Sequence, residues 1–194
     1  DFFINKNGRI SVEQFDKELE MLRNAYPECV AYVQQNLFDS HDTNRLLSHI
    51  VNDNIEKFRN WGTYFNISKA ENPNYDTRKP DAEEYNLQKL MAIFQMTYLG
   101  APMIYYGDEV GMWGANDPCC RKPMVWDDII YDDEVTMPDQ TKKPQVDKVE
   151  VNHDVLEHYK KLIKIRNSNI ALQLGDFKTV LIDNEKGLYG FVRE

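Results

Sequence analysis

The spacing of apolar residues along the chain predicts helices that alternate with short buried strands. Residues 12–26 carry an apolar side chain at every third or fourth position after a Ser11–Gln14 capping box, as an amphipathic helix does. In chain order, the predicted elements are a helix over 12–26, a strand over 30–38, a helix over 44–58, a helix over 81–100, a strand over 101–106 and a helix over 154–167. Because strands that alternate with helices pair in parallel, this order predicts an α/β fold.

Three further segments do not follow this alternation of helices and strands. Residues 61–80 hold Gly62, Pro73 and Pro80 together with four aromatic residues, so we interpret them as a long excursion and not as a linker. Residues 127–149 are polar and are expected to form a loop. Residues 177–182 and 188–192 flank a turn that ends in Gly187, which predicts a β-hairpin. Because a lone hairpin is marginal in water, we expect it to open a second, β-rich domain.

Composition narrows the class of protein. The 194 residues carry a net charge of −9, which argues against binding to a nucleic-acid backbone and is compatible with a neutral substrate. The apolar fraction of 42% is typical of soluble globular proteins, and no apolar run approaches the roughly 18 residues that cross a membrane. The location in the cell stays open. Cys29, Cys119 and Cys120 do not form a disulfide framework, so we expect free thiols.

Two apolar runs end abruptly in polar residues. The first reads Leu37-Phe38-Asp39-Ser40-His41-Asp42-Thr43-Asn44-Arg45, and the second runs from Ala101 to Glu109 and continues to Asp117 and Arg121. A buried strand that delivers carboxylates at its carboxyl end has this pattern. Parallel α/β barrels place their chemistry at that end of the strands.

These two segments resemble the α-amylase family of glycoside hydrolases. Phe38-Asp39-Ser40-His41-Asp42-Thr43-x-Arg45 is similar to the family signature after barrel strand seven, and the run 102–112 is similar to the end of strand eight. Asp117-Pro118-x-x-Arg121 resembles the loop that follows, with most similarity to the neopullulanase, cyclomaltodextrinase and maltogenic amylase branch. The resemblance implies a retaining hydrolase of α-glucans, cleaving α-1,4 and in some members α-1,6 bonds, on a (β/α)8 TIM barrel followed by a β-sandwich domain.

The resemblance also implies roles for individual residues. Asp42 matches the third catalytic carboxylate, which stabilises the transition state, and His41 would bind hydroxyls of the same sugar. Asp117 and Arg121 would contact a sugar one or two subsites away, although the branch often has an acid at the position of Cys119. Two alternatives stay open from the residues alone, namely that His41-Asp42 caps the next helix and that Asp117 and Arg121 form only a loop salt bridge.

Arg45, Asp108 and Glu109 are expected to support the barrel rim. Adjacent carboxylates on a strand point to opposite sides, so Asp108 and Glu109 would not both face one substrate. His153-Asp154 repeats the histidine–aspartate pair, but we expect Asn152 or Asp154 to cap the helix there. Sugar stacking and core packing are equally open for four aromatic residues, Trp61, Tyr64, Phe65 and Trp113.

The family nucleophile and acid/base would lie upstream of this chain. We therefore expect residues 1–175 to be the C-terminal part of the catalytic barrel, 176–194 to begin the β-sandwich domain, and the isolated chain to be inactive without its N-terminal partner segment. The branch often dimerises through an upstream domain. No cofactor is expected, and although some members carry calcium, no cluster of oxygen ligands marks a metal site here.

Two other interpretations compete with an α-glucan hydrolase. The parent protein could be a non-catalytic relative, a glycan-binding or scaffold protein that has lost its acids. Alternatively, the chain could be a complete small α/β protein. Two strands and one hairpin would leave the apolar helix faces of such a protein uncovered, so we expect the isolated chain to associate or aggregate.

Overall fold

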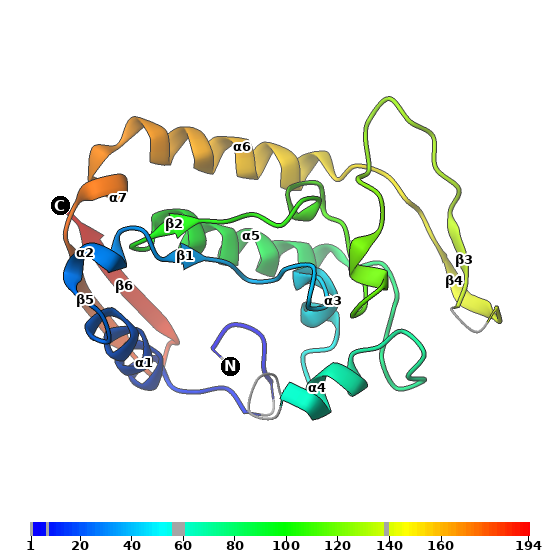
Figure 1. Ribbon diagram of the computed structural model, residues 1–194, viewed down its shortest axis with the longest axis horizontal. Coiled ribbons are helices and arrows are strands. Elements are labelled where there is room, and N and C mark those ends of the chain that lie inside the picture. Colours follow the sequence, from blue (N-terminus) through cyan, green and yellow to red (C-terminus); the bar gives the residue numbers. More distant parts are fainter. Residues whose placement is uncertain (1, 7, 56–60, 138–139) are drawn as a thin grey trace.

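Two short parallel strands lie at the centre of a computed structural model of the chain, with helices around them (Figure 1). The structure describes residues 2–6, 8–55, 61–137 and 140–194. The helices are α1 (Val12–Asn24), α2 (Glu28–Ala31), α3 (Leu46–Val51), α4 (Trp61–Ile67), α5 (Ala82–Thr97), α6 (His153–Ser168) and α7 (Ile170–Leu174), with 3-10 turns η1 (Asp108–Val110) and η2 (Cys119–Arg121). The strands are β1 (Gln35–Asn36), β2 (Ala101–Pro102), β3 (Glu134–Thr136), β4 (Lys142–Asp147), β5 (Phe177–Asp183) and β6 (Leu188–Arg193).

The central strands confirm the predicted parallel pairing, although they are shorter than predicted. β1 pairs with β2 in parallel, with Gln35 opposite Ala101 and Asn36 opposite Pro102. The prediction of a strand from residue 30 is wrong, because Val30 and Ala31 belong to α2, which follows Pro27. Proline favours the start of a helix and β-branched residues favour strands, so the two local signals conflict here.

Helix α5 lies against both central strands. Asp81 and Glu84 form its capping box, as the acidic start of this segment predicted. On its buried face, Gln95 donates from Nε2 to the backbone oxygens of Asn36 (2.9 Å) and Met103 (2.8 Å). One amide therefore holds the segments of β1 and β2 together from the side.

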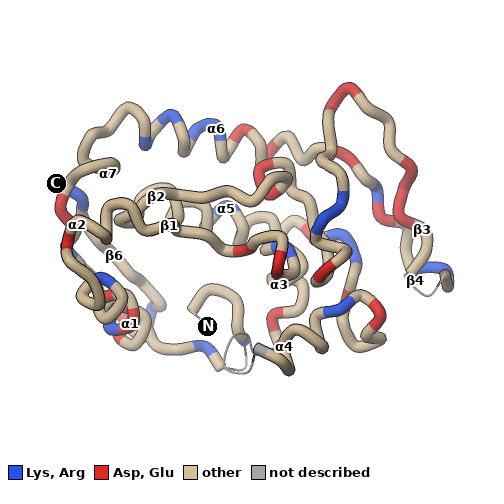
Figure 2. Tube along the Cα trace, viewed as in Figure 1, with Lys and Arg blue, Asp and Glu red and all other residues tan. Residues whose placement is uncertain are grey.

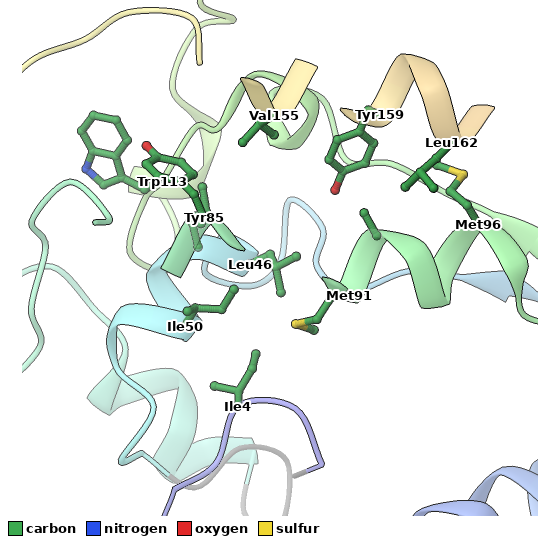
Figure 3. Close-up of a cluster of buried hydrophobic side chains, with 12 residues drawn as sticks. Ile4, Leu46, Ile50, Tyr85, Met91, Met96, Trp113, Val155, Tyr159 and Leu162 are labelled. Atoms are coloured by element: carbon green, nitrogen blue, oxygen red, sulfur yellow. The ribbon is translucent and has the colours of Figure 1, made fainter. Parts of the chain in front are cut away.

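The main apolar core lies between α3, α5 and α6 (Figure 3). Its fully buried members include Leu46 and Leu47 of α3, Ala92 of α5 and Val155 of α6. Asn152 caps α6 by accepting from the Val155 N–H at 3.2 Å, which confirms the predicted helix start. These helices enclose the turn that follows β2.

The N-terminal cap of α1 and the C-terminal end of α3 differ from those predicted. Ser11 accepts from the Gln14 N–H, but the Gln14 side chain bonds Glu18, so only half of the predicted capping box forms. Helix α3 ends at Val51, earlier than predicted, because the Asn52 side chain bonds the Ser48 oxygen and the Asp76 backbone instead. The predicted end of this helix, at residues 56–58, lies outside the described residues.

The excursion at 61–80 is ordered by buried tyrosines. It begins with α4, which the sequence did not predict, and returns past Tyr75. Tyr64 donates to the Asn44 Oδ1, and Asn44 donates to the Tyr75 hydroxyl at 2.6 Å. The excursion therefore packs onto the chain just before α3.

The segment 127–149 is not the loop that was predicted. β3 and β4 form an antiparallel ribbon within it. Lys143 lies almost fully buried in that ribbon, between Asp147 at 2.5 Å and Glu134 at 3.2 Å. The ribbon is held by buried ion pairs instead of apolar side chains, so hydrophobic periodicity does not reveal it. Figure 2 shows that charged positions gather around this ribbon, whereas β1 and β2 carry few.

The predicted hairpin is present as β5 and β6, whose turn contains Gly187 at a φ of +64°. It packs against α1 and α5 through aromatic pairs, including Phe15 with Tyr189 at 5.3 Å and Tyr98 with Phe177 at 5.1 Å. From β6, Arg193 donates to the backbone oxygens of Thr97, at the end of α5, and of Gly175. Assignment of the hairpin to a separate β domain stays a prediction.

None of the described helices combines the length and apolar character that a membrane span requires. All three cysteines are free thiols, as predicted. Burial raises the pKa of the Cys120 thiol, and its Sγ lies 3.4 Å from the backbone oxygen of His41.

Candidate active site

The turn after β1 presents His41 and Asp42 to solvent. Ser40 and Thr43 close this turn, because the Ser40 N–H donates to Thr43 Oγ1 at 3.1 Å and the Asp42 N–H donates to Ser40 Oγ at 3.2 Å. The side chains of His41 and Asp42 remain 61% and 66% exposed. They touch each other, with His41 Nε2 at 3.3 Å from Asp42 Oδ2.

The alternative role of Asp42 as a helix cap is wrong. Helix α3 begins after Arg45, and its first N–H group, that of Leu46, donates to Asp39 Oδ2 at 2.7 Å. Because Asp39 takes the capping role, the Asp42 carboxylate is left to face outward.

The loop after η1 brings the second pair of predicted residues to the same place. Arg121 in η2 bonds Asp117 from Nε at 2.8 Å and the His41 backbone oxygen from the same nitrogen at 3.1 Å. Its Nη2 lies 3.5 Å from Asp42 Oδ1. His41, Asp42, Asp117 and Arg121 therefore form one cluster although almost eighty positions separate the two pairs.

The ion pair of Asp117 with Arg121 was also the competing interpretation of these two residues. It is present, but it does not enclose either side chain, since 40% of Asp117 and 48% of Arg121 remain exposed. Both can therefore still contact a ligand above the cluster.

Beneath the exposed cluster lies a buried ionic layer. Arg45 is fully buried, donates from Nη1 to the Tyr106 backbone oxygen at 2.6 Å and lies 3.5 Å from Asp108 Oδ1. Its guanidinium faces the rings of Tyr105 and Tyr106 at 4.6 and 4.7 Å. Stacking on two rings favours arginine over lysine at this position.

The two adjacent acids at the end of the second segment point apart, although they lie in η1 instead of a strand. Glu109 turns back to accept from the Gly107 N–H at 2.8 Å, whereas Asp108 is buried. Gly107 has a φ of +91°, and a Cβ there would lie 2.3 Å from the sulfur of Met112, so only glycine fits this turn.

Burial raises the pKa of Asp108 well above the ordinary range of a carboxyl group. The nearby carboxyl of Asp39, which is hydrogen-bonded to it, acts in the same direction, and Arg45 opposes both. We therefore expect the Asp108 carboxyl group to stay protonated at pH values at which exposed carboxyl groups are ionised.

The aromatic candidates divide between core and surface. Tyr64 is buried against Asn44, so it belongs to the core. Trp113 is 5% exposed at the edge of the main cluster, and its indole nitrogen is buried although Figure 3 shows the ring turned away from the other labelled side chains. Phe65 is partly exposed beneath Lys69, and the side chain of Trp61 lies outside the described residues.

Sequence reasoning missed two residues of the site. Asp39 was quoted in the motif without a role, and its position seven residues before Leu46 gives no local capping signal. Tyr106 bonds Arg45 through its backbone oxygen and the Lys122 oxygen through its hydroxyl, at 2.7 Å. Neither partner is close to Tyr106 in the sequence, so only the fold reveals the contact.

The second histidine–aspartate pair of the sequence does not join this cluster. His153 pairs with Asp127 at 3.1 Å on the surface at the start of α6. Among the residues that the structure describes, no group of three or more His, Cys, Asp or Glu side chains is arranged to hold a metal ion.

The arrangement offers two accessible carboxylates, an imidazole and a guanidinium above a buried base. A guanidinium presents a planar set of donors to neighbouring hydroxyls, and an unburied carboxylate can accept hydroxyl protons or stabilise positive charge. The cluster is thus suited to a polyhydroxylated ligand that develops positive charge.

Two curated proteins are similar to this chain over nearly its whole length. Neopullulanase 2 of Thermoactinomyces vulgaris is 36% identical over 186 residues, covering 96% of this chain and 23% of that protein. A cyclomaltodextrinase of a Bacillus species is 31% identical over 194 residues, covering 100% of this chain and 25% of that protein. The chain therefore spans about a quarter of the length of these relatives.

Comparison of the fold with solved structures identifies relatives of the same kind. The solved structure of a cyclomaltodextrinase superimposes with a TM-score of 0.67 at 29% identity, covering 100% of this chain and 24% of that one. The structural relatives are TIM-barrel enzymes of the α-amylase family, of which this chain corresponds to a part. A model of the α-amylase catalytic domain matches residues 72–175, more than half of the sequence. The chain belongs to the α-amylase catalytic-domain family.

Proposed function

We propose that this chain is the C-terminal part of the catalytic barrel of a retaining α-glucan hydrolase that cleaves α-1,4 glucosidic bonds, with α-1,6 bonds as a second linkage that stays open. The observation that carries the proposal is the assembly of His41, Asp42, Asp117 and Arg121 into one exposed cluster. The names of the relatives, neopullulanase and cyclomaltodextrinase, support an α-glucan as the substrate.

In this proposal the exposed cluster binds the sugar at the cleavage point and a neighbouring glucose unit. Glycoside cleavage develops positive charge on the sugar ring, and retaining enzymes use two carboxyl groups about 5–5.5 Å apart as nucleophile and acid/base. Asp42 is the third carboxylate, which holds the ring hydroxyls and stabilises that charge with the help of His41. Asp117 and Arg121 bind a neighbouring glucose unit.

The nucleophile and the acid/base come from barrel strands outside this chain. Parallel sheets are normally covered on both faces and continue on both sides, so a two-stranded parallel pair such as β1 and β2 fits within a larger barrel. Residues 1–175 are the end of that barrel, and the hairpin within 176–194 opens a β-sandwich domain.

The chain of residues 1–194 alone is expected to show no hydrolysis of maltooligosaccharides, whereas the full-length protein hydrolyses them. The reason is that Asp42 stabilises charge but supplies neither a nucleophile nor a leaving-group proton. Release of reducing sugar measures both samples. Hydrolysis by the short chain, free of contaminating amylase, would contradict the proposal. A full-length protein that binds the glucan without cleaving it would instead be a non-catalytic relative.

Replacing Arg121 by lysine in the full-length protein is expected to raise KM roughly tenfold, with kcat within about threefold. The variant keeps the positive charge beside Asp42 but loses the planar donors, and one charged hydrogen bond is worth about 1.5 kcal/mol. Initial rates on maltotetraose give both constants. Arg78→Lys is the matched control, because Arg78 pairs with Glu84 away from the cluster. An unchanged KM would remove Arg121 from substrate binding.

A further inference from the structure

Three ionisable side chains are buried directly beneath the turn that carries Asp42. Asp39 and Arg45 lie at its two ends and Asp108 lies in η1, and their exposed fractions are 2%, 0% and 4%. Ionisable groups are rarely buried to this degree unless they are paired. Their position under the exposed cluster suggests that they serve it.

These side chains fix both ends of the turn. Asp39 accepts from the Leu46 N–H at 2.7 Å, which ties residue 39 to the start of α3. Arg45 donates its backbone N–H to the Gly114 oxygen at 2.9 Å and its side chain to the Tyr106 oxygen at 2.6 Å. The turn is thereby attached to the segment after β2, which also carries Arg121.

The charges of this layer balance only if one proton is retained. With both carboxyl groups ionised, Asp39, Asp108 and Arg45 would carry a net negative charge without access to water, which is strongly unfavourable. With one proton on the two acids, the set is neutral. Burial raises the pKa of Asp108 most, and Asp39 raises it further, which agrees with one proton retained by the two acids.

Among the described groups that shift the pKa of Asp108 most, Arg45 is the only cation. Helix α5 contributes Gln88, whose Nε2 donates to the Asp108 backbone oxygen at 2.8 Å, and α6 contributes Tyr159, whose own pKa is raised by burial and by Asp108. Glu109 in η1 adds negative charge. Every one of these neighbours favours the protonated form of the acid pair or leaves it unchanged.

We propose that Asp39 and Asp108 share one proton and, with Arg45, form a neutral buried set that positions the turn carrying Asp42. This role rests on the proposed function, since Asp42 is the residue that would touch the substrate. Asp39, Arg45 and Asp108 are positioning residues and do not contact the sugar themselves.

The shared proton makes the site sensitive to rising pH. An acid whose pKa is raised by folding stabilises the folded state fully below its unfolded pKa, near 4, and that stabilisation is lost as pH rises toward the folded pKa. Loss of the proton leaves two adjacent negative charges that repel each other. They would push Asp39 from Leu46 and loosen the turn.

The test compares Asp108→Asn with Asp108→Leu in the full-length protein. Asparagine is always neutral and still donates to Asp39, whereas leucine has a similar size and cannot donate. We expect Asp108→Asn to keep kcat on maltotetraose within about threefold of the parent, and Asp108→Leu to lose at least about tenfold. KM should change less than threefold in both, because Asp117 and Arg121 are untouched.

A second measurement does not depend on activity. The parent protein should lose thermal stability between pH 5 and pH 8, and in Asp108→Asn that loss should be smaller by at least about 2 °C in Tm. Glu157→Gln, an acid-to-amide change on the exposed face of α6, should leave the loss unchanged. The Asp108→Leu variant is used only in the comparison of kcat, and only when the sample is folded.

The outcomes separate the two proposals. If the parent hydrolyses maltotetraose but Asp108→Asn shows the same pH-dependent loss of Tm, or the asparagine and leucine variants have equal kcat, the shared proton is wrong and the proposed function stands. If the parent shows no hydrolysis, the proposed function fails. The Tm comparison then still decides whether the acids share a proton.

Discussion

Replacing Asp42 by asparagine in the full-length protein is expected to lower kcat for maltooligosaccharides by roughly 10²–10³-fold, the usual effect of removing one group that stabilises developing charge. The amide keeps the shape of the carboxylate but not its negative charge. Because the Asp42 side chain is mostly exposed and caps no helix, the fold should not change. Initial rates together with thermal unfolding measure the two effects separately.

The chain supplies a matched control for this variant. Asp127 also pairs with a histidine, His153, at a similar distance and exposure, but it lies outside the cluster. Asp127→Asn should therefore leave kcat unchanged. Equal rates for Asp42→Asn and the parent protein would remove Asp42 from the mechanism, whatever the control shows.

Replacing Arg45 by methionine should be the most destabilising single change in the site. It removes the only cation of a buried ionic layer, and breaking such a set typically costs about 3–5 kcal/mol. The lost bond to the Tyr106 oxygen adds to that cost. Urea unfolding of the full-length protein at pH 7 measures the loss in free energy of unfolding.

Arg9→Met provides the comparison for Arg45→Met. Arg9 is exposed, so its replacement should change stability by less than about 0.5 kcal/mol. The loss for Arg45→Met should also shrink at pH 5, where a second proton can neutralise the remaining acid. A stability within 1 kcal/mol of the parent at pH 7 would show that Arg45 does not balance these charges.

Signals between neighbouring residues in the sequence were sufficient to predict where the long helices α5 and α6 begin. The starts of α5 and α6 follow from capping residues that act within three or four positions, Asp81 with Glu84 and Asn152 with Val155, whereas α5 ends at Thr97 and not at the predicted Gly100. Such contacts can be identified in a sequence because both partners lie in the same turn. The parallel order of β1 and β2 followed from the alternation of strands and helices.

Long-range contacts explain what the sequence did not reveal. The β3–β4 ribbon depends on Lys143 between Asp147 and Glu134, and a charged residue in a polar segment normally indicates a solvated loop. The strand predicted from Val30 starts later because Pro27 precedes the short helix α2, and Ala31 at the end of α2 is buried in one cluster with Tyr98 and Leu99, almost seventy positions away.

The site itself was predictable only through the resemblance. The spacing of residues in the sequence gave no reason to place Arg121 next to Asp42. The resemblance to the family motifs gave that reason. The layer beneath was only partly foreseen. Arg45 and Asp108 were assigned to support of the rim, but the hydrogen bond of Asp39 to Leu46 depends on the path of the turn between them.

The contact of Arg193 with the end of α5 affects where the protein can be divided. Sequence patterns place a domain boundary near residue 175, and an expression clone would naturally stop there. Yet Arg193 supplies donors to the Thr97 and Leu172 oxygens, and the last carbonyl groups of a helix need such partners. A clone that ends at residue 175 would lose the Arg193 donor at the end of α5 and keep only that of Arg166 to the Met96 oxygen. Dividing the protein near residue 175 would therefore separate the end of α5 from a partner that lies in the β5–β6 hairpin.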